Sequence, residues 1–258
     1  MFAFAGLLLA SCKVTQPYQS PVVNTNSLFR DTTITDTTTI ADLHWNEIFT
    51  DTILQRLIEQ GIQHNPDLQI AYTRIQQSQA YYLQSGAAFF PTLNGNAGVT
   101  SSRFSKSQAA QVNGATQYQV GLSASWEADI WGKLSSSKKA NLANLLQTES
   151  AARAVQTNLV STIANYYYSL LALDQQLAIT RLTVKNWDTT VQTMEALKEA
   201  AVVTGAAVVQ SEAQRYAAEV TIPDLKQTIK ETENALSILI GNSPAGIRRG
   251  LLQDQSLD

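Results

Sequence analysis

Residues 133–204 contain neither glycine nor proline, and this uninterrupted stretch constrains the fold more than any other feature of the chain. From residue 159 onward, a step of four and three residues marks eleven positions, of which ten are apolar. This spacing is typical of a helix that packs along another helix. A helix over residues 133–200 would be about 100 Å long at roughly 1.5 Å per residue. A compact domain of 258 residues is several times smaller in radius, so a simple globule is excluded.

Residues 206–240 repeat the same step, with seven of ten positions apolar. Gly205 lies between the two helical stretches and predicts the turn of a long helical hairpin. Its tip would consist of Val203, Thr204 and Gly205. Pro223 removes one hydrogen bond of the second helix, which should therefore bend near that residue.

The helices before the strands are shorter. Residues 43–61 carry a helical apolar stripe, and we expect that helix to end near Gly61. Asn65 then predicts the N-cap of a second helix, with Pro66 at its first position. This helix continues toward Gly86 and is stopped at Pro91.

Between the helical stretches the period changes to two. Residues 116–127 alternate without exception, residues 93–104 alternate more weakly, and the polar residues 105–115 join them as the loop of a hairpin. One face of the second strand carries Tyr118, Val120, Leu122, Ala124 and Trp126, and the other carries Gln117, Gln119, Ser123 and Ser125.

Two interpretations of the hairpin compete. A soluble hairpin would bury its apolar face on a helix, whereas a membrane hairpin would turn that face toward lipid and the Gln/Ser face toward a water-filled lumen. Open strand edges are not tolerated in hydrocarbon, so membrane insertion requires several hairpins that close one barrel. The alternation alone does not choose between them. The long helix and the N-terminal segment favour the membrane.

Residues 1–10 are apolar but too short to span a bilayer, and Leu9-Ala10-Ser11-Cys12 resembles the bacterial lipobox. We therefore expect a signal segment over residues 1–11 and an acylated Cys12 as the mature N-terminus. No Lys or Arg precedes Cys12, which departs from the usual basic start. Residues 13–42 are rich in Thr and Asn, which predicts an extended tether.

Composition argues against catalysis and nucleic-acid binding. The chain has 18 Lys and Arg against 21 Asp and Glu, without a basic patch. Two His and one Cys leave little material for a metal site, and no cofactor is expected. Glu127 and Asp129 lie where the second strand passes into the long helix, so we assign them to a cap or to hydrogen bonding within the junction rather than to acid–base chemistry.

Taken in order, these segments resemble the outer-membrane efflux factors of the TolC/NodT type. The matching motifs are the lipobox, Trp45-Asn46-Glu47-Ile48-Phe49, Asn65-Pro66-Asp67-Leu68, Phe90-Pro91-Thr92-Leu93, Trp126-Glu127-Ala128-Asp129-Ile130-Trp131-Gly132-Lys133-Leu134, Val203-Thr204-Gly205-Ala206-Ala207-Val208 and Leu239-Ile240-Gly241. The resemblance implies a mainly α fold in which a long coiled-coil hairpin accompanies membrane β-strands. It also implies a trimeric, lipid-anchored outer-membrane duct that passively exports drugs and small solutes. The tip hairpin would meet a periplasmic adaptor (membrane fusion protein) and an inner-membrane RND-type transporter.

The resemblance also divides the chain. It implies a signal over 1–11, a lipidated tether over 12–42, first helices over 43–91, a transmembrane hairpin over 92–127, a periplasmic helical hairpin over 128–241 and a linker over 242–258. Family members carry two such repeats, and this sequence contains one. Family members also commonly have a glycine where Ala201 stands, which leaves the position of the tip turn open. A soluble periplasmic coiled-coil adaptor and a non-functional truncated fragment remain alternatives.

Overall fold

A computed structural model describes residues 19–22, 43–102 and 115–255 of the chain. The chain divides into two units, Met1–Leu43 and His44–Asp258. Few residues of the first unit are described, and the expected signal segment, Cys12 and most of the tether lie outside the described residues. All the helices and strands that the structure describes belong to the second unit.

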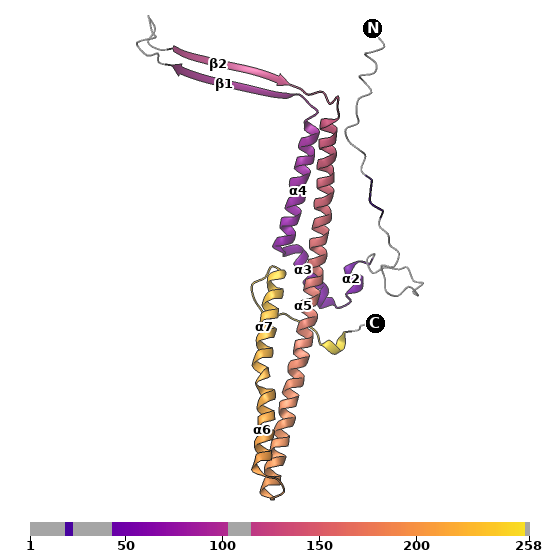
Figure 1. The fold of residues 1–258 in the computed structure, drawn as a ribbon, viewed down its shortest axis with the longest axis vertical. Coiled ribbons are helices and arrows are strands. Elements are labelled where there is room, and N and C mark those ends of the chain that lie inside the picture. The colour runs from indigo at the N-terminus through magenta and orange to yellow at the C-terminus, as the bar shows by residue number, and fades with distance from the viewer. Residues whose placement is uncertain (1–18, 23–42, 103–114, 256–258) are drawn as a thin grey trace. The chain divides into compact units, whose positions relative to one another are not determined.

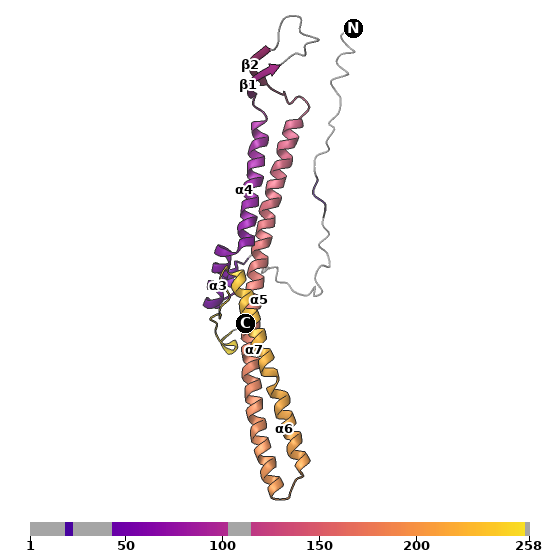
Figure 2. The same ribbon diagram turned by 90° about the vertical axis from the view of Figure 1, so that its left-hand side faces the viewer.

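Helix α5 (Lys133–Glu199) is the longest element of the second unit, with 67 residues. Helix α4 (Pro66–Ala87) contacts α5 and runs beside its N-terminal part, whereas α6 (Gly205–Glu219) and α7 (Thr221–Leu239) run beside its C-terminal part (Figures 1 and 2). The predicted long helix and its hairpin partner are thus confirmed, with α5 ending one residue before the expected Ala200.

The core lies near the middle of α5, where α3 (Thr52–His64), α4 and α7 meet that helix. Its fully buried members include Leu54, Ile58, Leu68, Ile163, Tyr167, Leu170 and Leu236. Burial of such side chains contributes about 1.5–3 kcal/mol each. Gly61 belongs to this region, because a Cβ atom at its position would overlap Cδ1 of Ile163.

The prediction of one helix over residues 43–61 is wrong. The structure has a short α2 (Trp45–Ile48) and a separate α3, with the break before Asp51. The side chain of Asp51 caps α3 by accepting hydrogen bonds from the backbone N–H groups of Ile53 (2.7 Å) and Leu54 (3.4 Å). Gly61 does not end α3, which continues to His64. The glycine instead allows α3 to approach Ile163 of α5 closely.

The predicted cap at Asn65 is confirmed. Its side-chain oxygen accepts the Leu68 N–H at 3.0 Å, and Pro66 is the first residue of α4. Its amide nitrogen also donates to the carbonyl of Leu239 at 3.0 Å. Asn65 therefore ties the start of α4 to the end of α7, a role that the local motif does not reveal.

The second arm of the helical hairpin is interrupted at Val220, which separates α6 from α7. Pro223 explains the interruption, because it has no N–H to donate to the carbonyl of Glu219 and its ring crowds that carbonyl. The helix is thus interrupted close to Pro223, whereas Val220 itself keeps helical backbone angles (φ −62°, ψ −20°), so the bend stays a prediction.

The sequence predicts the tip turn at Gly205, but the structure forms it at Ala201. Ala201 has φ 55°, the left-handed conformation, and Gly205 is the first residue of α6. The Val202 N–H donates to the Leu197 carbonyl and the Ala201 N–H donates to the Lys198 carbonyl, both at 2.9 Å. This pattern is a Schellman motif, in which glycine is usually preferred at the left-handed position.

The end of α7 provides the matching case. Gly241 has φ 74°, and the Asn242 N–H donates to the Ser237 carbonyl at 2.8 Å. The left-handed position of the Schellman motif is thus occupied by glycine after α7 (Gly241) and by alanine after α5 (Ala201).

We predict that Ala201→Gly raises the free energy of unfolding by about 1 kcal/mol, because glycine adopts positive φ without a steric cost. The measurement is chemical denaturation followed by circular dichroism. Gly241→Ala is the matched control and should destabilise by more than that amount, because its Cβ would also lie 2.8 Å from Cβ of His64. A destabilised Ala201→Gly variant would contradict the assignment of the turn.

Candidate functional site

Strands β1 (Thr92–Ser102) and β2 (Ala115–Ser125) form an antiparallel hairpin whose register separates two faces. Directly opposed residues point to the same side of a sheet. The apolar face pairs Leu93 with Ala124, Ala97 with Val120 and Val99 with Tyr118, and it also carries Leu122 opposite Gly95. The polar face pairs Thr92 with Ser125, Asn94 with Ser123, Gly98 with Gln119 and Thr100 with Gln117. The predicted division into two faces is confirmed.

Both faces of this hairpin are exposed. The side chains of Leu122 and Val120 are 91% and 85% exposed, and Tyr118 is similarly open. Within the described residues, each strand pairs only with the other. No described helix covers the apolar face in the way that a soluble hairpin would require.

Trp126 does not belong to the strand as predicted. It lies one residue after β2, where its indole N–H donates to the Phe89 carbonyl at 3.0 Å. This bond joins the end of β2 to the segment between α4 and β1 at the base of the hairpin.

The two carboxylates at the strand-to-helix junction have structural roles. Asp129 accepts hydrogen bonds from the backbone N–H groups of Leu134 (2.8 Å) and Ser135 (2.9 Å), and so caps α5 from outside the helix. Glu127 forms an ion pair with Lys133 at 2.9 Å. Their predicted assignment to the junction is confirmed.

The helical tip lies at the other end of α5. Ala201 and Val202 form the hydrogen-bonded turn, Val203 and Thr204 follow it, and Gly205 begins α6. Val202, which the sequence did not single out, is 68% exposed beside them. The tip therefore presents apolar side chains around a compact, hydrogen-bonded turn.

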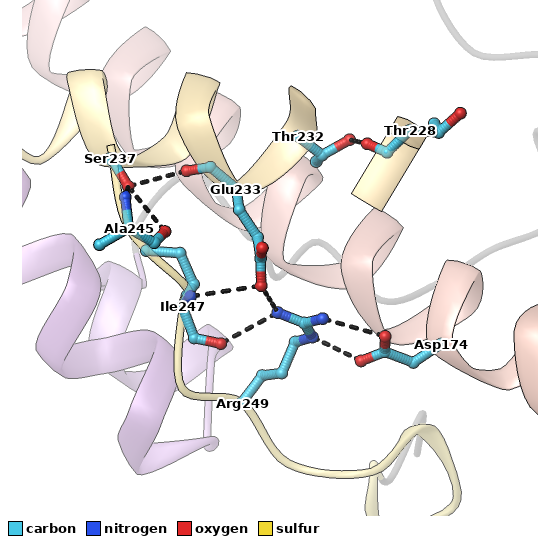
Figure 3. Close-up of polar contacts among 8 residues, drawn as sticks. All are labelled: Asp174, Thr228, Thr232, Glu233, Ser237, Ala245, Ile247 and Arg249. Carbon is cyan, nitrogen blue, oxygen red and sulfur yellow. Dashed lines mark hydrogen bonds and ion pairs between the residues drawn. The ribbon is translucent and has the colours of Figure 1, made fainter. Parts of the chain in front are cut away.

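The segment after α7 crosses back over α5 and is held there by Arg249 (Figure 3). The guanidinium group donates two hydrogen bonds to Asp174 of α5, at 2.5 and 2.9 Å, and a third to Glu233 of α7 at 2.5 Å. The side chain of Arg249 is only 13% exposed. These hydrogen bonds, first that to Asp174, raise the pKa of Arg249 and keep it charged.

A second set of contacts anchors the same segment to α5 and to the start of α3. The Tyr167 hydroxyl donates to Asp51 at 2.5 Å, and the side chain of Gln255 donates to the same carboxylate oxygen at 2.9 Å. The Gly250 N–H donates to the Tyr167 oxygen at 3.3 Å. We call the six side chains of both sets the clasp; they are Asp51, Tyr167, Asp174, Glu233, Arg249 and Gln255.

The clasp shifts two further pKa values. Burial, together with the hydrogen bond to Asp51, raises the pKa of Tyr167 to about 12. Burial alone would raise the pKa of Asp51, but the hydrogen bonds from Tyr167, Ile53 and Gln255 outweigh it and lower that pKa. The carboxylate and the neutral phenol are therefore the forms that the fold stabilises.

Sequence reasoning did not find the clasp. Arg249 and Asp174 are 75 positions apart, and Tyr167 and Asp51 are 116 apart. The family resemblance implied only a linker over residues 242–258 and gave no indication of its contacts.

In residues 19–22, 43–102 and 115–255, no three His, Cys, Asp or Glu side chains come together as metal ligands. Over the same ranges, no helix combines the length and apolar character needed to cross a membrane.

The sequence matches the family described as "Outer membrane efflux protein" over residues 57–242. It is 29% identical to "Probable outer membrane lipoprotein SilC" of Salmonella typhimurium, covering 94% of this chain and 54% of that protein. It is 30% identical to "Pyoverdine export outer membrane protein OpmQ" of Pseudomonas aeruginosa, covering 76% and 43%. The chain thus spans about half the length of the curated relatives it matches.

Solved structures agree on the fold. Crystal structures of CusC superpose with a TM-score of 0.77 at 25% identity, covering 93% of this chain and 54% of that one. The open-state MtrE outer membrane channel of Neisseria gonorrhoeae gives a TM-score of 0.76 at 24% identity, covering 93% and 53%. The expected fold class, mainly helical with a β-hairpin as in such channels, is confirmed.

We predict that alkaline pH weakens the fold through Tyr167. Because its folded pKa lies above the ordinary value of 10.0, its contribution is complete below pH 10 and is lost as the pH rises toward about 12. The free energy of unfolding should fall by about 1–2 kcal/mol more in the wild type than in Tyr167→Phe over that interval. Denaturation at several pH values measures this difference. The neighbouring Tyr166→Phe is the control and should keep the wild-type slope; equal slopes in all three proteins would contradict the prediction.

Proposed function

The chain belongs to the outer membrane efflux protein family, and on that premise we propose that it forms part of a passive export duct. In this proposal the hairpin lies in the outer membrane and the α5–α7 hairpin extends into the periplasm. The exposed two-faced hairpin is the observation that carries the proposal. A strand of about 9–11 residues is long enough to cross a bilayer when tilted, and both strands have 11.

The unpaired edges of the hairpin require neighbours. In hydrocarbon each unsatisfied N–H or C=O costs several kcal/mol, so β1 and β2 need further strands at their outer edges. We propose that other copies of the chain, or a second repeat of the same kind, supply them in a trimeric assembly. Tyr118, Val120, Leu122 and Ala124 would then face lipid, with Trp126 at the membrane boundary.

The opposite face supports conduction. Gln117, Gln119, Ser123 and Ser125 would line a water-filled lumen, and the long helices would continue that path below the membrane. Transport through such a duct is passive, with drugs and other small solutes as the proposed cargo. The relatives differ in the cargo that their names state, pyoverdine for OpmQ and cations for CusC.

We further propose the partners of a tripartite pump. The tip residues Val203, Thr204 and Gly205 would dock a periplasmic adaptor and, through it, an inner-membrane RND-type transporter. Lipidation of Cys12 would anchor the mature chain to the outer membrane. The exposed apolar Val202 beside the tip supports a contact surface there.

The two faces can be tested with adjacent substitutions. We predict that Val120→Lys abolishes outer-membrane insertion, because a lysine on the lipid face costs about 2–4 kcal/mol near the bilayer midplane. Gln119→Lys should insert normally and shift the conductance toward anions, because its charge would enter the lumen. Membrane fractionation and planar-bilayer recordings of the purified chain provide the two readouts.

The wild-type chain and Gln119→Ser serve as controls for both readouts. Equal tolerance of the two lysines would contradict the assignment of the faces. Recovery of the wild-type chain in the soluble periplasm, without lipid on Cys12, would favour a coiled-coil adaptor over a duct. Insertion without conductance would restrict the chain to a structural component.

A further inference from the structure

The two segments of the second arm are attached to the other helices in different ways. α7 is tied at its C-terminal end to the start of α4, through the Asn65 bond to the Leu239 carbonyl, and it is tied to α5 at Glu233, where Arg249 bridges Glu233 and Asp174. In the described structure, α6 has one ion pair to α5, from Arg215 to Asp188 at 3.2 Å, and Asp188 is half-exposed. Exposed ion pairs contribute little, typically below about 1 kcal/mol. α7 therefore has more, and less exposed, polar attachments than α6.

Arg249 gives the attachment of α7 a defined position along α5. An apolar heptad seam offers similar surfaces at successive turns, and a buried polar group is what usually selects one register. The guanidinium group binds Asp174 in a bidentate manner while it contacts Glu233, so it places these two helices at one relative height (Figure 3). A one-turn slip of α7 would remove Glu233 from its reach.

The break at Val220 separates this fixed segment from the tip. Val220 is exposed, and Pro223 leaves the Glu219 carbonyl without its helical donor. Sharp bends in helices occur at such sites, and a hinge needs only a few residues that absorb the change in backbone angles.

We propose that Arg249 is a pin that fixes α7 on α5, and that residues 220–223 are a hinge about which α6 and the tip move as one arm. The role of this movement depends on the proposed function. A partner that docks at the tip would move α6 while α7 and the β-hairpin stay in place. The pin and the hinge themselves involve residues of this chain alone.

Distances between spin labels test both parts of the proposal. Leu182 on α5 is the shared reference, paired with Val209 on α6 or with Ile238 on α7; all three side chains are exposed. The labelled proteins carry Cys12→Ser so that no other thiol reacts, and are measured as full chains in detergent. The 182–209 distance distribution should be about twofold broader than the 182–238 distribution, because only α6 lies beyond the hinge.

Three substitutions then separate pin from hinge. Pro223→Ala should narrow the 182–209 distribution, and Arg249→Leu should broaden the 182–238 distribution by about twofold. Arg249→Lys, which retains the charge without the bidentate geometry, should give an intermediate width. The exposed neighbour Arg248 provides the matched control, and Arg248→Leu should change neither distribution.

Equal widths for the two pairs in the otherwise unsubstituted chain would overturn the hinge. A 182–238 distribution that stays narrow in both Arg249 variants would overturn the pin. Because these measurements need neither membrane insertion nor export, a rigid α6 would leave the duct proposal standing. Conversely, a chain that fails to conduct would leave the hinge and the pin unaffected.

Discussion

The fold depends on one uninterrupted ladder of backbone hydrogen bonds, that of α5. A helix of 67 residues satisfies its own backbone, but in water it is stabilised mainly by what packs on its apolar face. α3, α4, α6 and α7 all contact it, so each of them takes its position from α5. Its two ends are also secured, by Asp129 at the start and by the Schellman turn at the tip.

The hairpin obeys the same requirement in a different way. Its inner backbone groups are paired, but the outer edges of β1 and β2 have no described strand beside them. The helices therefore satisfy their hydrogen bonds within the chain, whereas the strands need neighbours. This contrast underlies the proposed duct, because the neighbouring strands that complete the sheet would also close it into a barrel around a water-filled path.

Local patterns were predicted where a single physical preference decides the structure. The Asn65 cap, the limits of α5 and the two faces of the hairpin follow from capping, heptad spacing and alternation. Prediction failed where two local preferences competed. The apolar stripe over residues 43–61 predicted one continuous helix, but the cap at Asp51 starts a separate one. The turn was predicted at Gly205 because glycine is the favoured residue for a positive φ, whereas the chain has Ala201 in that conformation.

The sequence by itself determined the class of each element, the long helical hairpin and the polar and apolar faces of the strands, because periodicity and capping act between residues close in the chain. Only the tertiary structure decided that Gly61 makes room for Ile163, that Asn65 reaches Leu239, and that Arg249 bridges two helices. Such contacts depend on the path by which the chain returns to α5. The residues next to a charged or polar side chain in the sequence do not indicate which distant residue it contacts in the fold.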